Sequence, residues 1–210
     1  TYAGELLSVD IETAEAHWRY PIAIDSNASA ASAGSLVIIG DATGVLHAVD
    51  RETGAGVWQV QLGGTIFATP AIRNDSVIVG DFSGIIWSID IDSGDVLWTH
   101  QLGDAIFASA AADESTVIVG SDLGLIEALD LATGELRWQF ETDDAIRASP
   151  TISGDMVYFA SHNGFLYALN IEDGSEVWRA EIGGQMTTPL VLDGEIIVNL
   201  VAGEVVALAE

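Results

Sequence analysis

Residue types that catalyse reactions or bind metals are few in this chain, and they are badly spaced for either task. There is no cysteine among its 210 residues, which removes disulfides, thiolate metal sites and cysteine nucleophiles. Imidazoles that bind a metal must converge, but the four histidines are far apart: His17, His47, His100 and His162. No Gly-x-Ser-x-Gly elbow for a nucleophilic serine is present. The sequence therefore predicts no catalytic residue, no metal site and no cofactor.

The acidic segment DIDSGD, with Asp90, Asp92 and Asp95, superficially resembles a calcium loop. An EF-hand loop needs glycine at its sixth position and glutamate at its twelfth. Here Gly94 is fifth and Gln101 occupies the twelfth position. Since Asp and Gly also form tight turns, the sequence favours a turn, with calcium binding as the second possibility.

A repeat runs through the whole chain. Five tryptophans recur at a spacing of 40 residues: Trp18, Trp58, Trp98, Trp138 and Trp178. Glycines share the same period, at Gly44, Gly84, Gly124 and Gly164. A period of this length indicates a repeat architecture, here with a final partial repeat at 183–210.

Each repeat contains four short apolar runs separated by Asn-, Asp- and Gly-containing turns, as in residues 66–104. Short runs rich in Val and Ile are typical of strands, whereas a helical repeat would need longer apolar stripes. The middle runs are apolar on both faces, so each sheet needs a neighbour on either side. The sequence therefore predicts an all-β fold over 1–210, a β-propeller of four-stranded antiparallel blades, with segments such as ATPAI innermost.

The segments AVDRETGAGVW and ALDLATGELRW resemble the tryptophan-docking motif of the pyrroloquinoline-quinone (PQQ)-like propeller repeats. That family includes quinoprotein dehydrogenases and the propeller lipoprotein of the outer-membrane assembly machine. The resemblance implies that each Trp packs on the Ala and the Thr-Gly peptide of an adjacent blade. Trp58, Ala48, Thr53 and Gly54 would take these parts, and the first repeat departs with Ala14 in place of glycine.

The number of blades is left open. The chain starts within a repeat, at GELLSVD, and ends in the same part of a later one, at GEVVALA. Both ends could complete one blade and close a five-blade ring, which would remove free sheet edges. The alternatives are part of a larger propeller of seven or eight blades, or a partial ring that associates with itself.

One variable position suggests a ligand site. The residue entering each innermost strand is in turn Asn27, Phe67, Phe107, Arg147 and Met186. These side chains are predicted to surround one mouth of the central channel, where two aromatic rings and an arginine could hold a flat anion. Alternatively, the rings only fill the axis and Arg147 pairs with Asp143 or Asp144.

A second variable position lies in the third strand, at His47, Trp87, Glu127 and Tyr167. We expect it at the partly exposed edge of each blade. His47, Trp87 and Tyr167 would then form a patch that binds a partner protein, with aromatic anchors.

The charge is strongly negative: 32 acidic residues against 6 basic ones, all arginine, give a net charge of −26. Such a surface repels phosphate backbones and anionic lipid. A lysine-free acidic composition favours adaptation to molar salt, which screens self-repulsion; a cationic partner is the alternative. No apolar run approaches the ~18 residues of a membrane span.

The resemblance implies a function without catalysis. We expect an extracytoplasmic propeller that acts as a protein-interaction scaffold or ligand-sensing domain, with another protein or a small ligand as its partner. The alternative is a fragment of a PQQ-dependent dehydrogenase. Those enzymes imply adjacent cysteines, a calcium-binding set and more blades, none of which this sequence offers.

Overall fold

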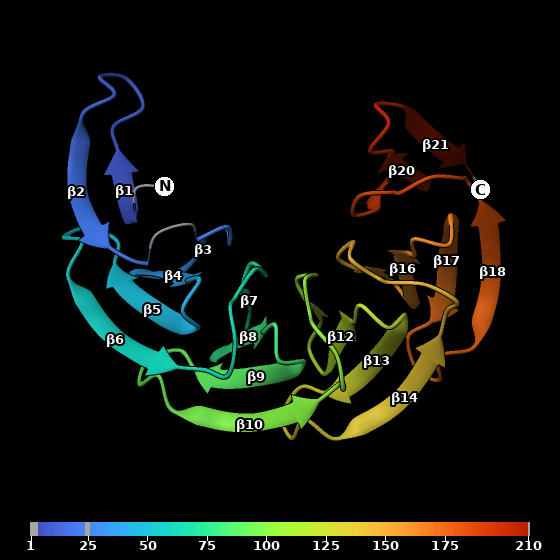
Figure 1. Ribbon diagram of the computed structural model, residues 1–210, viewed down its shortest axis with the longest axis horizontal. Helices are drawn as coiled ribbons and strands as arrows, with labels where there is room; N and C mark the ends of the chain where they lie inside the picture. The colour runs from blue at the N-terminus through green and yellow to red at the C-terminus, as the bar shows by residue number, and fades with distance from the viewer. Residues whose placement is uncertain (1–3, 24–25, 210) are drawn as a thin grey trace.

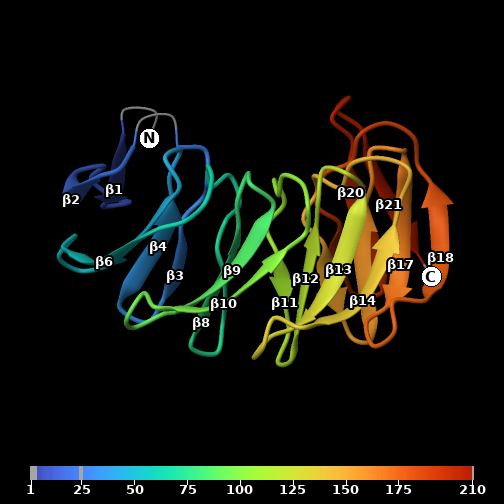
Figure 2. The ribbon, with the colours of Figure 1, turned by 60° about the horizontal axis from the view of Figure 1, so that its bottom comes forward.

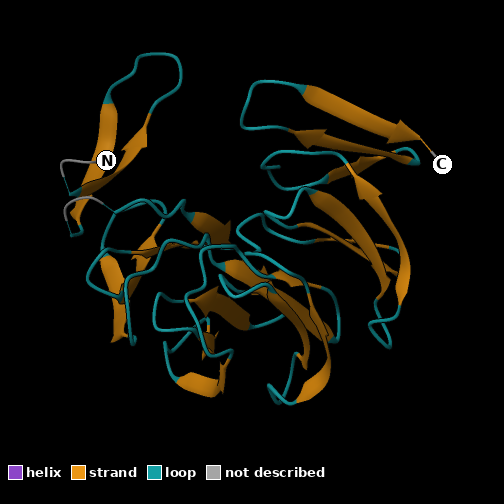
Figure 3. Ribbon diagram, turned by 45° about the vertical axis from the view of Figure 1, so that its right-hand side comes forward, coloured by secondary structure: helices purple, strands orange, loops and turns teal. Residues whose placement is uncertain are grey.

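The computed structural model of the chain describes residues 4–23 and 26–209. These residues form 21 strands and no helix (Figure 3), so none of them forms a helix that could cross a membrane. Four sheets are complete, each with four antiparallel strands, and they follow one another along an arc (Figure 1). The predicted all-β fold with four-stranded antiparallel blades is confirmed.

The complete sheets are called blades 1 to 4 in chain order. Blade 1 has β3 (Ala31–Ala33), β4 (Leu36–Gly40), β5 (Val45–Asp50) and β6 (Gly56–Gln61). Blade 2 has β7 (Ala71–Arg73), β8 (Ser76–Gly80), β9 (Ile85–Asp90) and β10 (Val96–Gln101). Blade 3 has β11 (Ala111–Ala112), β12 (Thr116–Gly120), β13 (Leu125–Asp130) and β14 (Leu136–Glu141). Blade 4 has β15 (Thr151–Ser153), β16 (Met156–Ala160), β17 (Phe165–Asn170) and β18 (Glu176–Glu181).

The core lies between the blades, which stand side by side (Figure 2). Ile78 and Ile86 of blade 2 pack with Val117, Val119 and Leu129 of blade 3, and all five are fully buried. Each middle strand alternates its side chains between the two neighbouring blades. This explains why the middle strands are apolar on both faces.

Glycine ends the second strand in blades 1 to 3 and leaves room for the next blade, whereas blade 4 has the small residue Ala160 there. A Cβ atom at Gly80 would lie only 2.4 Å from Cγ2 of Ile106, which enters from the next blade. Hydroxyl groups also join the innermost strands, because Ser109 Oγ accepts the Thr69 N–H at 2.9 Å and Ser149 Oγ accepts the Ser109 N–H at 3.0 Å. The short, small-residue inner strands thus pack closely and bond to one another near the axis.

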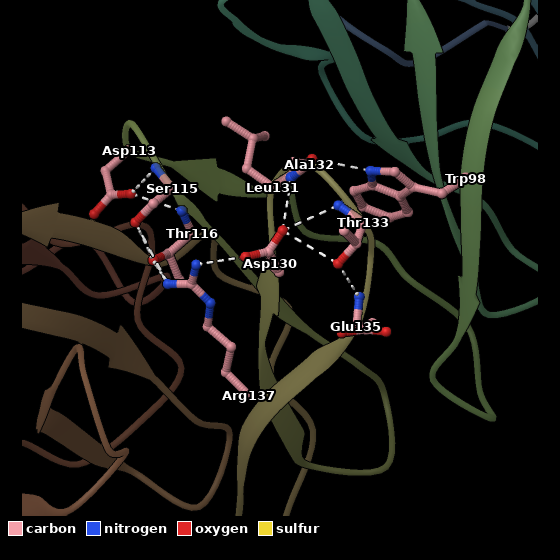
Figure 4. A network of polar contacts seen from close by, with 10 residues as sticks. All are labelled: Trp98, Asp113, Ser115, Thr116, Asp130, Leu131, Ala132, Thr133, Glu135 and Arg137. Atoms are coloured by element: carbon pink, nitrogen blue, oxygen red, sulfur yellow. Dashed lines mark hydrogen bonds and ion pairs between the residues drawn. The ribbon is translucent and has the colours of Figure 1, made fainter.

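The outer strand carries the tryptophan of the repeat, and its indole reaches the turn of the next blade. Trp98 Nε1 donates a hydrogen bond of 2.9 Å to the carbonyl of Leu131, 33 residues further on (Figure 4). Asp130 shapes this turn, because its carboxylate accepts the N–H groups of Ala132 and Thr133 at 3.0 Å. The same bond links three other pairs, Trp18 to Arg51, Trp58 to Ile91 and Trp138 to Ile171.

The aspartates of these turns should make the propeller sensitive to acid. Hydrogen bonds from Thr53 lower the pKa of Asp50, those from Ser93 lower the pKa of Asp90, and that from Arg137 is the largest influence lowering the pKa of Asp130. A carboxyl with a depressed folded pKa stabilises the protein above its unfolded pKa of about 3.9, and this contribution is lost as the pH falls through the folded value.

We expect the variant D50N/D90N/D130N to lose less stability than the natural protein between about pH 4 and pH 2, because asparagine does not titrate. Asparagine can form the turn, since Asn170 accepts the Glu172 N–H at 2.8 Å in the corresponding place. Thermal unfolding midpoints measured across this pH range give the comparison. Equal losses of stability in the two proteins would contradict the role given to these aspartates in acid sensitivity.

Two incomplete sheets end the arc. At one end β1 (Glu5–Val9) pairs with β2 (Ala16–Pro21), and at the other β19 (Leu190–Leu192), β20 (Glu195–Asn199) and β21 (Val205–Ala209) form a separate sheet. A gap separates the two sheets (Figure 1). These two sheets do not pair with each other among the described residues, and the number of blades remains a prediction. β1 and β21 are both third strands, so β21 occupies the place at which β1 would complete the final blade.

Candidate functional site

Three phenylalanines gather at one end of blades 2 and 3. The rings of Phe67 and Phe107 stack, with centroids 5.4 Å apart, and Phe82 meets both edge-on at 5.9 and 5.5 Å. Arg147 places its guanidinium 4.9 Å from the centroid of Phe107. Phe67, Phe82, Phe107 and Arg147 with its partner Asp122 are called the mouth cluster.

The local backbone explains why these side chains point outwards. Phe67 lies between Ile66 and Ala68, both buried in the core, and in an extended segment neighbouring side chains alternate between faces. Phe82 is in the turn between β8 and β9, where its N–H donates to the carbonyl of Thr65 at 2.9 Å. The linkers between blades and the second hairpin turns therefore meet at this mouth.

A buried carboxylate holds the turn of Phe82 in place. Asp81 is fully buried, and its Oδ1 accepts the Ser83 N–H at 2.7 Å. Its Oδ2 accepts a hydrogen bond of 2.7 Å from the indole Nε1 of Trp87. Phe82 is 51% exposed although its backbone is fixed in this way. The ring is thus an apolar group presented to solvent on a rigid support.

The arginine of the mouth cluster is part of an ion pair. Arg147 donates from Nε and Nη2 to the two carboxylate oxygens of Asp122, at 2.5 and 2.9 Å. This contact lowers the pKa of Asp122 and raises the pKa of Arg147. The prediction that Arg147 pairs with Asp143 or Asp144 is wrong, because Asp122 comes from the turn that packs beside the linker.

The structure brings together only part of the predicted ring of five mouth residues. Phe67, Phe107 and Arg147 lie together, and Asn27 is exposed in the first linker. Met186 is only 4% exposed and forms a bridge to Leu200, so its predicted place at the mouth is wrong. The last repeat has GGQMTTP where an earlier one has GGTIFATP, so it is one residue shorter. The missing residue follows Met186, and Met186 therefore occupies the core position that Ile146 has in blade 4.

The predicted exposure of the third-strand patch is also wrong. His47 and Tyr167 are buried, and Trp87 is half-buried. His47 Nε2 lies 2.9 Å from Asp41 Oδ2, and the Tyr167 hydroxyl accepts a hydrogen bond of 2.7 Å from Asn163. These side chains point toward the preceding blade, so they are not available as a patch on the surface.

Three third-strand residues meet a residue of the preceding outer strand. The pairs are Tyr20 with His47, His100 with Glu127, and Phe140 with Tyr167. Trp87 packs against the same core cluster as Val60. The chemistry differs at every interface, from a ring contact to a 2.8 Å contact between imidazole and carboxylate. Variation at this position therefore reflects matching between blades.

The turn of Asp90 is a hydrogen-bonded turn in which the carboxylate is already engaged. Its Oδ1 accepts the N–H groups of Asp92 and Ser93 at 3.1 and 2.8 Å, and the Ser93 hydroxyl at 2.9 Å. Among residues 4–23 and 26–209, no group of three His, Asp or Glu side chains is placed to hold a metal ion.

Sequence reasoning missed Phe82 and Asp122. Both stand two residues after the glycine that ends the second strand, at a position where the other blades have Ala42 and His162. The sequence signal for both residues was that this position varies between repeats while the rest of the turn is regular. An exposed aromatic side chain at such a position is a sign of an interaction surface.

The blades and their docked tryptophans define the class of the protein, a β-propeller built from PQQ-like repeats. Residues 2–121 and 101–210 both match the family described as outer membrane protein assembly factor BamB, and the chain belongs to this family. None of the curated proteins compared with the chain matches it in sequence.

Solved structures agree with this fold. BamB from Moraxella catarrhalis is 28% identical with a TM-score of 0.79, and the match covers 92% of this chain and 64% of BamB. The computationally designed protein Ika8 is 18% identical with a TM-score of 0.90, over 99% of this chain and 65% of Ika8. The designed protein Ika4 is 19% identical with a TM-score of 0.64, over 69% of this chain and 91% of Ika4. The chain thus spans slightly less than two thirds of the length of BamB and of Ika8.

Proposed function

We propose that this chain is a non-catalytic scaffold that binds another protein through the mouth cluster. The observation that carries the proposal is Phe82, a half-exposed ring supported by the stacked rings of Phe67 and Phe107. Rigid exposed aromatics are typical anchors of protein interfaces, because they bury a large area at little entropic cost. The family's description as an assembly factor supports the same class of function.

The surroundings of the cluster indicate the chemistry of the partner. Asp104, Asp143 and Asp144 lie in the same linkers as Phe107 and Arg147, and the charge of Arg147 is balanced by Asp122. A second apolar group, Leu123, is largely exposed beside a shallow hollow with Leu102 and Leu125. We therefore infer a partner segment with apolar side chains at its centre and Arg or Lys around them.

An extracytoplasmic location and adaptation to molar salt complete the proposal. The family membership supports the location, and the net charge of −26 supports the adaptation, since dense salt screens repulsion among so many carboxylates. Under these conditions contact with the partner would depend mainly on the apolar surface of the cluster.

The residues do not fit a PQQ-dependent dehydrogenase. Calcium at such a site needs several converging oxygen ligands, and the described residues contain no cluster of three or more His, Asp or Glu side chains placed to hold a metal ion. The cationic side chain at the mouth, Arg147, is already bound through two of its nitrogens by Asp122. Titration with PQQ and calcium should leave the tryptophan fluorescence unchanged, and a saturable change would favour the enzyme instead.

The scaffold proposal can be tested with displayed random peptides selected on the protein in molar KCl. We expect the selected peptides to combine aromatic or aliphatic residues with Arg or Lys. Phe82→Ser should weaken their binding at least tenfold, as loss of an interface anchor does. Val57→Ser is the matched control, because Val57 on β6 is also 51% exposed but lies away from the mouth.

Affinities of the two variants can be measured by fluorescence anisotropy of a labelled peptide. Equal binding by the natural protein and Phe82→Ser would place the site elsewhere. Loss of peptide binding in Val57→Ser would also place the binding site away from the mouth cluster.

A further inference from the structure

The turn between the second and third strands is covered by a glutamine amide in blades 1 and 2. In blade 1, Gln61 Nε2 donates a hydrogen bond of 2.9 Å to the carbonyl of Thr43. In blade 2, Gln101 Nε2 donates to the carbonyls of Ser83 and Gly84 at 3.2 and 3.0 Å. Both glutamines end the outer strand of their blade, so the outer strand satisfies the carbonyls of the turn beside it.

Blade 3 has no such amide. Its outer strand ends with Glu141, and a carboxylate accepts hydrogen bonds but does not donate them. Leu123 takes the position of Thr43 and Ser83 in the turn, and no described residue donates to its carbonyl. The turn of blade 3 therefore offers to a partner an acceptor that blades 1 and 2 use internally.

A hollow lies at this turn. It has a volume of about 290 Å³ and is lined by Leu102, Leu123, Leu125, Glu141 and Thr142. Pockets that hold whole small ligands start at about 300 Å³, so the hollow suits a single side chain. Three leucines make part of its wall apolar, and Glu141 forms no ion pair with another described residue. An occupant with an apolar stem and a cationic end matches both features.

Blade 4 has an arginine of its own in the corresponding region. Its outer strand also ends with a glutamate, Glu181, which pairs across the sheet with Phe165. Arg179, two residues earlier on the same face of the strand, places its guanidinium 5.4 Å from the centroid of the Phe165 ring. In blade 3 the positions of Arg179 and Phe165 hold Gln139 and Leu125, so its own outer strand supplies no arginine there.

We propose that the hollow of blade 3 binds an arginine side chain of the partner, an inference that rests on the proposed function. The stem of this arginine packs on Leu102, Leu123 and Leu125, as long cationic side chains do on apolar surface. Its guanidinium donates two parallel hydrogen bonds to the carboxylate of Glu141. A further N–H reaches the carbonyl of Leu123, in the place that the glutamine amide has in blades 1 and 2.

The charges around the hollow favour arginine over other side chains. Asp143 and Asp144 follow directly after Thr142, and Arg147 of the same linker is balanced by Asp122. The hollow therefore lies in a negative part of the surface, which attracts a cation. Lysine fits less well, because its ammonium is a point charge, whereas the planar fork of arginine can bind a carboxylate and a carbonyl together.

Titration of the 210-residue chain with butylguanidinium, which has the stem and the head group of arginine, tests the proposal. Chemical shifts of ¹³C-labelled leucine methyl groups, recorded in molar KCl, report binding. We expect saturable shifts at Leu123 and Leu125. Glu141→Gln should weaken the binding about threefold or more, as loss of a partly exposed charge pair does. It should fold normally, because Gln61 and Gln101 have the same position in blades 1 and 2.

Glu181→Gln is the matched control, since Glu181 ends the outer strand of blade 4 and should leave the titration unchanged. Butylammonium and the neutral butylurea are the comparison probes, and weaker binding of both supports the proposal. No saturable shift, or a shift that survives Glu141→Gln, overturns it. Equal binding of butylammonium overturns the assignment to arginine.

The titration does not need the mouth cluster, because butylguanidinium occupies the hollow alone. A failed peptide selection therefore counts against the scaffold proposal, and a failed titration counts against the arginine site.

Discussion

Replacement of Trp138 by alanine should lower the free energy of unfolding by about 3 to 5 kcal/mol, as loss of a buried Trp does. The side chain is buried between blades 3 and 4, and its Nε1 donates a hydrogen bond of 2.7 Å to the carbonyl of Ile171. The variant loses the apolar contact and leaves a turn carbonyl without its partner. Denaturant unfolding in molar salt measures the change.

Trp178→Ala provides the internal comparison. Trp178 has the same place in its repeat but is only half-buried, and the turn residue that would accept its bond is Glu210, outside the described residues. We expect a clearly smaller loss of stability than for Trp138→Ala. Equal losses would mean that the indole acts within its own blade and not as a link to the next one.

Gly134→Ala should destabilise the protein by about 2 to 4 kcal/mol, from a strained backbone together with overpacking. Gly134 has a φ of +72°, and an added Cβ would lie 2.5 Å from the Trp98 ring. The indole would have to move away from the carbonyl of Leu131, to which it donates its hydrogen bond.

Ala14→Gly is the opposite change at the corresponding turn of the first sheet. Ala14 already has a positive φ of +59°, which costs a non-glycine residue about 1 kcal/mol. We expect this variant to be as stable as the natural protein or up to about 1 kcal/mol more stable. Destabilisation by Ala14→Gly, or tolerance of Gly134→Ala, would contradict the role given to glycine in these turns.

The fold was predictable because each repeat has the same strands and turns and must cover its apolar faces in the same way. Trp98 and Asp130 recur with a constant spacing, so the turn, the outer strand and the docking indole could all be placed from the sequence. Gly80 was visible as a periodic residue, but its reason, the approach of Ile106 to 2.4 Å, required the neighbouring blade. Closure of the ring could not be predicted, because β1 and β21 are both third strands and either could complete the final blade. The repeat is the same in both cases and does not distinguish them.

The functional residues were harder to predict because they are the positions that vary. Tyr167 and Phe107 both vary between repeats, yet one is buried against Phe140 and the other lies at the mouth. Variation that matches neighbouring blades looks the same in a sequence as variation that serves a partner. The two kinds of variation can be told apart only when it is known which face of the strand packs against a neighbouring blade.

The central claim is that each sheet is stabilised by neighbours on both faces, so stability should be highest in the middle of the arc. Hydrogen exchange in molar salt tests it most directly. We expect the slowest exchange in β8, β9, β12 and β13, and the fastest among strands in β1, β2 and the β19–β21 sheet. Uniform protection along the chain, or the slowest exchange in the two end sheets, would contradict the account.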